Sequence, residues 1–487
     1  MEKKVIIIGS GIAGIATAIR LTAKGYIVSV YEANSYAGGK LSEVRLKNYR
    51  FDAGPSLFTM PQFVDELFIL LGEVPSQKFE YLKLINGCNY FYPDGTAFEA
   101  SSDINKLSTT LHQKLNENET TIAKFFKKSA ILYKITAPIF LENSLHKLST
   151  YFCKNGIYGI ANLWRLNLLS SMNFINAKTF RNTKTVQFFN RFATYNGSNP
   201  YEAPATLNII PHLEFGFGTF FPKKGMIDIT NSLVSLAKRH GVEFRYNQSV
   251  SEIIYTKNIA RGIKVNSEII KADIVISNMD VFPTYKKLLP LLKMPRKVKN
   301  VKSSSSALIF YWGIKKTFST LDLHNILFSE NYKSEFDSIF IYNTISSDPT
   351  VYINISNKYK LDDAPIGCEN WFVMINVPSN TGQDWDSLIH AARETIIAKI
   401  SKILNCDISE LIECEQILDP RTIEQKTSSY QGALYGSSSN KMMAAFFRHS
   451  NFSSSIKNLY FCGGSVHPGG GIPLCLLSAK ITSDLIK

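Results

Sequence analysis

The fold is decided by the stretch Lys4-Val-Ile-Ile-Ile8-Gly9-Ser-Gly11-Ile-Ala-Gly14, an apolar run followed at once by glycines in the pattern G-x-G-x-x-G. In this pattern the first glycine allows a tight turn, the second lets the backbone approach a pyrophosphate, and the third lets the next helix pack close to the strand. The phosphates bind the free N–H groups at the start of that helix. The stretch therefore predicts a strand, a turn and a helix that open a nucleotide-binding unit.

The following residues complete this unit. Ile15 to Ala23 has the small and apolar pattern of a buried helix, and Tyr26 to Tyr31 is a second strand. Glu32 closes that strand, roughly 20 residues after the glycines, where a carboxylate is expected to hydrogen-bond a ribose hydroxyl. The alternative is a signal peptide cleaved after Ala18, but such cleavage would destroy the motif, and the pattern continues beyond it. We therefore expect an adenine dinucleotide.

Length and composition narrow the class of protein. A chain of 487 residues exceeds what one hydrophobic core usually supports, so at least two domains are expected. Its seven cysteines include no C-x-x-C pair, which favours reduced thiols in the cytoplasm over a zinc site or a disulfide framework. No apolar stretch has the length of a membrane span. We expect a soluble or membrane-associated protein without a metal.

The net charge of +14 suggests a negatively charged partner. Lysine and arginine are dispersed except for one denser patch, Tyr285 to Lys302, where leucines and lysines alternate. Such a mixture suits attachment to anionic lipid, although an ordinary solvated face of lysines has the same composition. No nucleic-acid-binding motif accompanies the charge, so we expect no nucleic-acid partner.

Two further segments near the N-terminus suit the same ligand. Gly38-Gly39-Lys40 is a glycine-rich loop that ends in a cation, and its position would bring backbone and charge to the pyrophosphate from the opposite side. Gly54-Pro55-Ser56 follows a short strand and would bring the backbone against a flat ring. Gly-Pro is also a common turn, so this second assignment has a simpler alternative.

The middle of the chain has a different pattern of residues, with a hairpin and long apolar helical segments. Tyr90 to Phe98 has the pattern of a hairpin around Asp-Gly, and helical patterns follow at Glu119 to Tyr133 and Leu141 to Phe152. Because this region is rich in phenylalanine, leucine and isoleucine, we expect it to line an apolar substrate site. Later strand-like stretches, including Val351 to Ser356 and Trp371 to Val377, suit a sheet that forms one wall of a pocket.

Two later parts of the chain return to the nucleotide unit. An amphipathic helix at Ile229 to His240 precedes strands, and one of these would offer the backbone of Val250 to the adenine. At the C-terminus, a strand delivers Gly463-Gly464, a glycine-rich loop continues to Gly471-Ile472, and a helix runs from Leu474 to Ile486. Its N-terminus would be a second anion-facing site, so both ends of the chain are expected to bind one large cofactor.

Together these motifs resemble the bacterial carotenoid desaturase family, which consists of flavoproteins of the phytoene-desaturase type. The likeness covers essentially the whole chain, with later landmarks at Phe221 to Gly225, Ala272 to Asn278 and Tyr460 to Ala479. It implies FAD as the cofactor, with the isoalloxazine ring beside Phe51 to Ser56. The cofactor-binding residues that it implies are Gly9, Gly11, Ile12, Ala13, Gly14, Glu32, Gly38, Gly39, Lys40, Gly54, Pro55, Ser56, Val250, Gly464, Gly471 and Ile472.

The resemblance also implies an architecture. The fold class is α/β, with a Rossmann-type FAD-binding domain built from the discontinuous segments 1–80, 215–280 and 425–487. An α+β domain for substrate and membrane is inserted, formed by residues 81–214 and 281–424. One departure concerns Lys40, which replaces the usual arginine of the pyrophosphate loop and so keeps the charge but loses the bidentate fork.

Two segments, Ser56 to Pro61 and Arg191 to Pro200, look most like the branch of the family that acts on 1-hydroxylated carotenoids. This resemblance implies that an acyclic carotenoid receives a double bond at C3–C4. The alternatives on the same scaffold are phytoene desaturation, carotenoid isomerisation with a redox-silent flavin, and a ketolase-like oxidation. An amine oxidase would share the glycine fingerprint, and a carotenoid carrier that keeps FAD as a structural element is the non-enzymatic alternative.

Desaturation beside a polyene needs no strong base, because the positive charge left by hydride loss is delocalised. His467, in the C-terminal glycine loop, is the only candidate for a catalytic polar group; its alternative is a structural histidine bonded to the loop backbone. The substrate implies a cytoplasmic enzyme attached peripherally to the inner face of the cell membrane. Quinone or oxygen is expected to accept the electrons.

Overall fold

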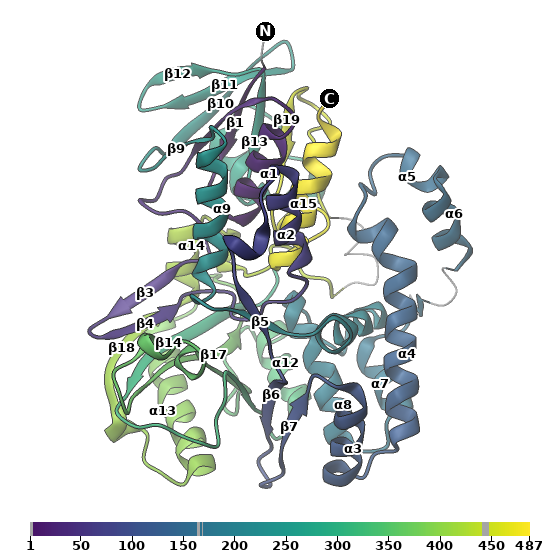
Figure 1. Cartoon of the computed structure of the whole chain (residues 1–487), viewed down its shortest axis with the longest axis vertical. Coiled ribbons are helices and arrows are strands. Elements are labelled where there is room, and N and C mark those ends of the chain that lie inside the picture. Colours follow the sequence, from purple (N-terminus) through teal and green to yellow (C-terminus); the bar gives the residue numbers. More distant parts are fainter. Residues whose placement is uncertain (1–2, 163–165, 168, 441–447) are drawn as a thin grey trace.

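The computed structural model describes residues 3–162, 166–167, 169–440 and 448–487. Its upper part in Figure 1 contains both chain termini, its lower part contains a large sheet, and helices form the right-hand side. Segments far apart in the sequence lie side by side in each part.

A five-stranded parallel sheet forms the centre of the upper part. Its strands, in spatial order, are β19 (Leu459–Phe461), β13 (Ile274–Ser277), β1 (Lys4–Ile8), β2 (Ile27–Tyr31) and β9 (Glu243–Arg245). If the five strands are numbered 1 to 5 by their order in the sequence and read from the β9 edge, the spatial order is 3-2-1-4-5, which is the Rossmann order. The continuous apolar run of β1 fits this position, because a central parallel strand is buried on both faces.

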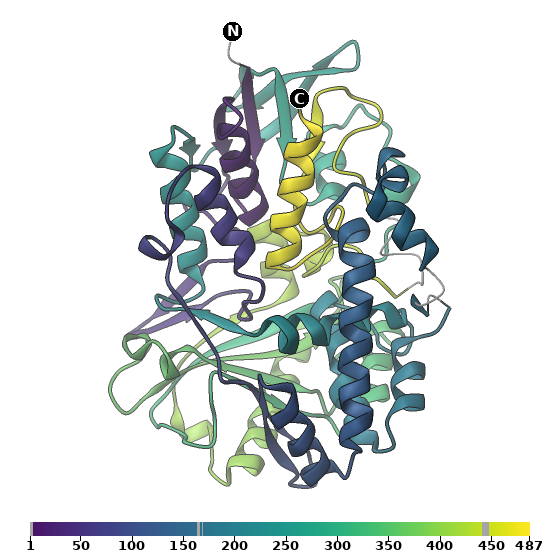
Figure 2. The same ribbon diagram turned by 45° about the vertical axis from the view of Figure 1, so that its right-hand side comes forward.

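Different layers cover the two faces of this sheet. Val5 and Ile7 pack against helices, whereas Ile6 and Ile8 pack against a second, three-stranded sheet. Figure 2 shows the helices in front of the strands. The helices are α1 (Ile12–Thr22), α2 (Gln62–Leu70), α9 (Ile227–Arg239) and α15 (Ile472–Leu485), and the small sheet contains β10 (Val250–Thr256), β11 (Ile259–Val265) and β12 (Glu268–Lys271).

A seven-stranded sheet forms the lower part. Its strands, in spatial order, are β18 (Ile412–Leu418), β14 (Ser306–Ile314), β17 (Glu369–Val377), β16 (Val351–Ile355), β15 (His324–Leu327), β6 (Asn86–Phe91) and β7 (Ala97–Ser101). Along β14, Phe310 and Trp312 belong to the core beneath helix α13 (Trp385–Leu404), whereas Ile309 and Tyr311 face the opposite side. Period-two alternation therefore leaves one face of the sheet to line a cavity.

Helices and short elements complete the molecule. The remaining helices are α3 (Ile104–Leu115), α4 (Glu119–Thr136), α5 (Ser149–Phe152), α6 (Lys154–Ala161), α7 (Met172–Thr179), α8 (Thr183–Asn190), α10 (Val281–Pro283), α11 (Arg296–Lys299), α12 (Tyr332–Phe340) and α14 (Pro420–Thr427). The two-stranded pairs are β3 (Glu43–Leu46) with β4 (Tyr49–Asp52), and β5 (Tyr81–Lys83) with β8 (Phe220–Pro222). On the right of Figure 1, helices α3, α4, α7 and α8 share a core rich in aromatic side chains that includes Phe125, Phe188 and Phe189.

The predicted helix from Leu141 to Phe152 is wrong. A π-helical turn ends at Leu141, and regular helix resumes only with the short α5. In between, polar side chains bond the backbone: the Asn143 amide donates to the Pro138 carbonyl, and the Thr150 hydroxyl donates to the Ser144 carbonyl. Such local bonds compete with the helical ladder, and the apolar spacing alone did not reveal them.

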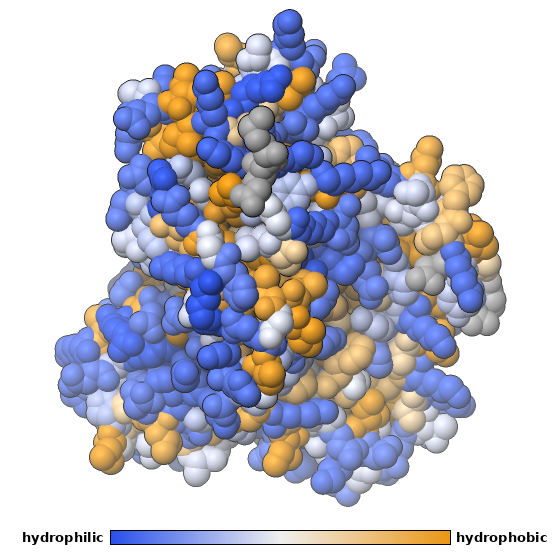
Figure 3. Space-filling model, turned by 45° about the horizontal axis from the view of Figure 1, so that its top comes forward, coloured by the Kyte–Doolittle hydropathy of each residue, from blue (hydrophilic) through white to orange (hydrophobic). Residues whose placement is uncertain are grey.

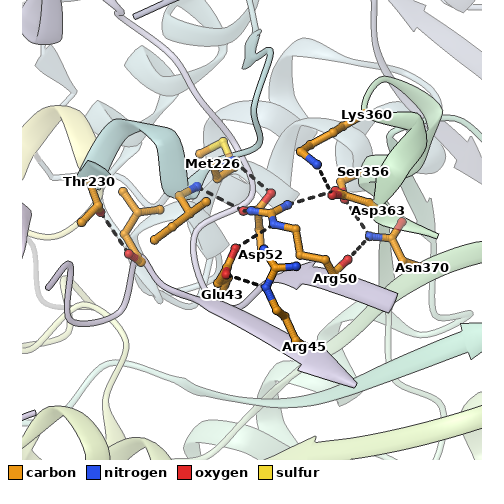
Figure 4. A network of polar contacts seen from close by, with 12 residues as sticks. Glu43, Arg45, Arg50, Asp52, Met226, Thr230, Ser356, Lys360, Asp363 and Asn370 are labelled. Atoms are coloured by element: carbon orange, nitrogen blue, oxygen red, sulfur yellow. Dashed lines mark hydrogen bonds and ion pairs between the residues drawn. The ribbon is translucent and has the colours of Figure 1, made fainter. Parts of the chain in front are cut away.

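A buried polar network joins the upper and lower parts (Figure 4). Arg50 donates to Asp52 at 2.5 Å, to Asp363 at 2.9 Å and to Glu43 at 2.9 Å. Asp52 in turn accepts the backbone N–H of Met226 at 3.0 Å, at the start of α9. Burial alone would lower the pKa of Arg50, but the facing carboxylates raise it, so the guanidinium is charged and fixes β4 to both parts.

Candidate functional site

A cavity of about 1720 Å³ runs from the parallel sheet to the seven-stranded sheet. Its lining includes Gly9 after β1, Glu32 after β2, Asn278 after β13 and Gly463 after β19, so it opens at the carboxyl ends of the parallel strands. Open α/β sheets bind ligands at this edge. Because a site for one small molecule usually measures about 300–1000 Å³, the cavity has room for a cofactor and a second ligand.

The N-terminal glycine loop lies at one end of this cavity. Gly9, Gly11, Ile12 and Ala13 line it, and Gly11 is the N-cap of α1 without a capping side chain among the described residues. The first N–H groups of α1 are therefore available to a ligand. Gly14 lies outside the lining: a Cβ there would stand 2.3 Å from the Gly9 carbonyl oxygen, so this glycine permits close packing of helix on strand.

Glu32 fastens this loop to the end of β2. One carboxylate oxygen accepts the N–H and the hydroxyl of Ser10, both at 2.8 Å, and the other accepts the N–H and the side-chain amide of Asn34 at 2.9 and 3.0 Å. The Glu32 backbone carbonyl also accepts the Gln248 N–H at 2.8 Å, two residues before Val250, which lines the cavity. A bond from Glu32 to a ribose hydroxyl stays a prediction.

Two cations belong to the cavity lining, the partly buried Lys40 and the buried Arg448. Lys40 donates to the carbonyls of Ala433 and Leu434 at 2.9 and 2.8 Å, and burial lowers its pKa to about 8 despite the opposing attraction of Asp280. Burial likewise lowers the pKa of Arg448 to about 10. The carboxyl group of Asp280 faces both cations, and burial raises its own pKa. This excess of positive charge, next to free helix N–H groups, fits an anionic diphosphate.

Arg448 is a residue that the sequence analysis missed. It donates to the backbone carbonyls of Tyr435, Ser437 and Gly464 at 3.0, 3.0 and 3.2 Å. It belongs to no recognisable motif, and only the folding of the C-terminal segment onto the glycine loop brings it beside Lys40. No local signal in the sequence could have identified it.

Gly38, Gly39, Gly54, Pro55 and Ser56 also line the cavity. At Gly54 a Cβ would stand 1.8 Å from the Lys40 carbonyl oxygen, so only glycine lets this segment lie against the loop that ends at Lys40. From the C-terminal segment, Gly464, Gly471 and Ile472 contribute to the lining at the start of α15. The cavity thus brings the two ends of the chain together.

His467 lies outside the cavity lining, although its neighbour Pro468 belongs to it. The imidazole is buried, and its Nε2 lies 2.9 Å from the carbonyl oxygen of Asn143. Burial lowers its pKa to about 4, so the ring is neutral near pH 7. This geometry favours a structural role over a catalytic one, although the ring contacts the backbone at Asn143 and not the backbone of its own glycine loop.

The far end of the cavity is mostly apolar, with a few buried polar groups. Its lining includes Leu207, Ile210, Leu213, Ile326, Phe372 and Met374. Arg191 lies among them, bonded to Tyr195 at 2.8 Å and to Glu214 at 3.0 Å. His324 and Tyr352 line the same region from the seven-stranded sheet, as expected for a sheet that forms one wall of a pocket. Among the described residues, no three His, Cys, Asp or Glu side chains form a group that could hold a metal ion.

Comparison with known proteins agrees with this geometry. The family model for flavin containing amine oxidoreductase matches residues 12–487. The 1-hydroxycarotenoid 3,4-desaturase of Flavobacterium sp. is 53% identical over 99% of both chains. A phytoene desaturase of Fusarium fujikuroi is 31% identical, over 100% of this chain and 89% of the relative.

Solved structures show the same fold at low sequence identity. An oxidoreductase from Methanosarcina mazei has a TM-score of 0.63 at 16% identity, covering 99% of this chain and 100% of its own. Cyclohexylamine oxidase from Brevibacterium oxydans has a TM-score of 0.63 at 14% identity, covering 100% and 99%. The predicted fold class is thereby confirmed, as is an oxidoreductase with a flavin cofactor. With its glycine loop, cations in the cavity lining and matching family model, the chain belongs to the flavin containing amine oxidoreductase family.

Proposed function

We propose that this protein is an FAD-dependent carotenoid desaturase that introduces the 3,4 double bond into an acyclic 1-hydroxycarotenoid. The observation that carries the proposal is the likeness to the 1-hydroxycarotenoid 3,4-desaturase, which extends over 99% of both chains. The cavity supports it, because one end is built for a dinucleotide and the other is lined by apolar side chains. A long polyene has the shape and polarity that such an apolar end accepts.

The residues that would hold FAD are those that line the dinucleotide end. The glycine loop and the N-terminus of α1 suit the pyrophosphate, with Lys40 and Arg448 opposite, and the segment from Gly54 to Ser56 suits the ring. When bound, FAD supplies the acceptor for the two electrons that leave the substrate as a hydride. The chain itself contributes position and exclusion of water.

The reaction needs a hydride from one CH2 group and a proton from its neighbour. The apolar lining holds the polyene and excludes water, and delocalisation of charge along the polyene makes the second C–H acidic. No catalytic base is assigned. Reoxidation of the flavin requires an external acceptor, for which we propose a quinone or oxygen.

The substrate dissolves in membranes, so we propose a cytoplasmic protein attached peripherally to the inner face of the cell membrane. Helices α5 and α6 stand out from the body of the molecule (Figure 1) and expose large apolar side chains, and Figure 3 shows hydrophobic side chains on this lobe at the right. The exposed side chains are Leu148, Phe152, Ile157, Tyr158 and Ile160. No helix within the described residues is long and apolar enough to cross a bilayer.

Basic residues lie beside this lobe. The pKa of His146 is lowered by burial and, to a smaller extent, by the charge of Lys297. Because Lys297 belongs to the predicted basic patch and His146 lies just before α5, this part of the patch is close to the lobe. Lys286, Lys287, Lys293 and Lys299 of the patch are exposed, as is Leu291. Apolar side chains with lysines around them are typical of surfaces that bind anionic lipid at its interface.

The function is tested by expressing the protein in a host that makes acyclic carotenoids, with and without the 1-hydroxylated precursor. We expect a product with one more conjugated double bond, and a red-shifted absorption band, only when the hydroxylated precursor is present. Conversion of phytoene, an isomerised product of unchanged mass, or an oxygenated product would each contradict the proposal and identify the alternative reaction.

A further inference from the structure

A chain of hydrogen bonds crosses the wall of the cavity from the ring-facing segment to the seven-stranded sheet. The Ser56 hydroxyl lies 2.7 Å from the Tyr352 hydroxyl, which lies 2.8 Å from Nδ1 of His324. Ser56, Tyr352 and His324 all line the cavity. His324 begins strand β15 and Tyr352 belongs to its antiparallel neighbour β16, so the sheet fixes their relative position.

The hydrogen bonds around His324 determine which ring nitrogen carries the proton. The Asn354 side-chain amide donates to the Leu323 carbonyl at 3.0 Å, which identifies the atom that faces His324 Nδ1 at 3.2 Å as the NH2 group. Nδ1 must therefore accept. A neutral imidazole has one acceptor and one donor, so the hydrogen is on Nε2.

The ring is neutral because it is deeply buried. Only 3% of His324 is exposed, and burial, followed by the charge of Arg191, lowers its pKa to about 3. The Nε2 donor has no hydrogen-bond partner among the described residues, although it is buried. Buried donors are almost always satisfied, and the His324 side chain lines the cavity, so we infer that the partner missing from Nε2 is an acceptor on a ligand.

The surroundings define the chemistry of that acceptor. Near His324 the lining is formed by apolar side chains such as Ile326, Phe372 and Met374, which exclude a charged ligand. Arg191 also has a nitrogen without a partner, Nε, but its two terminal nitrogens are bonded to Tyr195 and Glu214 and its guanidinium lies over the ring of Phe192 at 4.3 Å, so the protein itself holds this side chain in place. A neutral hydroxyl oxygen on an otherwise apolar chain suits the free donor.

The covalent structure of the proposed substrate places its hydroxyl near the reacting carbons. C1, which carries the hydroxyl, is separated from C4 by three carbon–carbon bonds of about 1.5 Å each, so the hydroxyl lies within roughly 6 Å of the new double bond. A group that recognises it must therefore lie close to the flavin ring. His324 meets this condition, since two hydrogen bonds connect it to Ser56.

We propose that the Nε2–H of His324 donates a hydrogen bond to the C1 hydroxyl of the carotenoid and so selects the hydroxylated substrate. Tyr352 and Asn354 are positioning residues, because they hold Nδ1 as the acceptor and fix the ring. This inference rests on the proposed function and names the specificity-determining residue of the same site.

The test compares two carotenoids that differ only in the C1 hydroxyl. For the flavin-loaded wild type and each variant, kcat/KM is measured for both carotenoids, and Kd is measured for both by quenching of protein fluorescence. We expect His324→Leu to reduce the preference for the hydroxylated carotenoid by about 10- to 100-fold in both quantities, because the donor is lost. His324→Gln restores a donor at a similar position and is expected to regain most of the preference.

Two further variants separate recognition from folding. Tyr352→Phe removes the bond that orients the ring, and we expect an intermediate loss of preference with a raised KM for the hydroxylated carotenoid. The matched control is His449→Leu, because His449 is a partly buried histidine that lies outside the cavity lining; its preference is expected to equal that of the wild type. Flavin content shows that each variant is folded.

The outcomes distinguish this inference from the proposed function. A wild type that desaturates neither carotenoid contradicts the proposed function and the inference together. A wild type that treats both carotenoids alike, or a flavin-loaded His324→Leu protein that keeps the full preference, overturns the role of His324 and leaves carotenoid desaturation in place.

Discussion

Lys40 and Arg448 are held in the cavity lining as cations that the surrounding protein only partly compensates. Their partners are mainly backbone carbonyls, and burial lowers the pKa of both side chains. An anion between them would reverse this shift, because a nearby negative charge favours the protonated form. This end of the cavity thus has an excess of positive charge that an anionic ligand would neutralise.

The pKa of Lys40 predicts how FAD binding depends on pH. In the unliganded protein Lys40 titrates near pH 8, whereas an unfolded lysine titrates near 10.5, so its positive charge disappears as the pH rises above 8. We expect FAD affinity to fall between pH 8 and pH 10, by up to about tenfold per pH unit. Fluorescence titration of flavin-depleted protein measures it.

Lys40→Met should bind FAD weakly with a flatter dependence on pH. Lys223→Met is the matched control, because Lys223 is exposed and bonded to Glu80 far from the glycine loop. An affinity that does not change between pH 7 and pH 10 in the wild type would contradict the role given to Lys40.

His467→Ala is expected to leave turnover unchanged in protein that retains its flavin. The substitution removes the contact between Nε2 and the Asn143 carbonyl, so the free energy of unfolding should fall by about 1–3 kcal/mol. Chemical denaturation and steady-state kinetics on the same preparation separate the two effects. A large loss of turnover at normal flavin content would return His467 to the mechanism.

Single residues of the site could be predicted from the sequence where a local motif fixes the backbone geometry. Gly9 and Gly11 could be placed by spacing alone, and both line the cavity. Arg448 and His324 could not, because strand pairing and the packing of distant segments determine where their side chains lie.

Among the elements, α5 and α6 differ most from the rest of the fold. Their large apolar side chains point to solvent: Leu148 is 76% and Phe152 78% exposed. In a helix pair of a globular protein these positions would normally be packed. Their exposure is the basis of the proposed contact with lipid.

Replacing both Leu148 and Phe152 by serine should reduce binding to anionic liposomes by tenfold or more. Insertion of each apolar side chain into the lipid contributes about 1.5–3 kcal/mol to the free energy of binding, and serine loses this contribution. Sedimentation with liposomes of defined anionic content measures it. Ile366→Ser, at a fully exposed residue in a loop of another region, is the matched control and should bind like the wild type. Equal binding by all three proteins would contradict this attachment site.

Element prediction succeeded where periodicity was long and regular. The helix predicted at Glu119 to Tyr133 is present as α4 (Glu119–Thr136), and the strand from Val351 is present as β16. The expected helix at Leu141 to Phe152 failed because side-chain bonds from Asn143 and Thr150 hold a turn there. Apolar spacing does not report such bonds.

Across the whole molecule, the three histidines with the most strongly lowered pKa values connect stability to pH. Burial lowers the pKa of His324 to about 3 and those of His449 and His467 to about 4. In the unfolded chain these histidines take up protons near pH 6.5, whereas in the folded protein they stay neutral until the pH approaches their lowered pKa values. The stability is therefore complete above pH 6.5 and is lost as the pH falls toward 4.

Between pH 6 and pH 4.5 we expect the free energy of unfolding to fall by roughly 1.4 kcal/mol per pH unit for each histidine, or about 4 kcal/mol per unit for all three. Urea denaturation at a series of pH values measures the slope. His449→Gln should reduce the slope by about one third. A stability that stays constant down to pH 4.5 would contradict the burial of these rings as neutral groups.

The overall architecture could be anticipated because motifs occur at both ends of the chain. Glycine loops after Ile8 and after Phe461 indicated that distant segments share one ligand, and both loops line the cavity. The pairing of β2 with β9 and the Arg50 network could not be foreseen, because neither leaves a local pattern in the sequence.

The position of β19 within the parallel sheet has a consequence for biosynthesis. This strand is formed by Leu459–Phe461 and pairs with Ile274–Ser277, while α15 packs on α1. A nascent polypeptide cannot complete these contacts until residues 459–485 have left the ribosome exit tunnel, so the N-terminal strands wait for this segment before the parallel sheet closes. A polypeptide that ends before Leu459 lacks this edge strand and leaves β13 unpaired on that side.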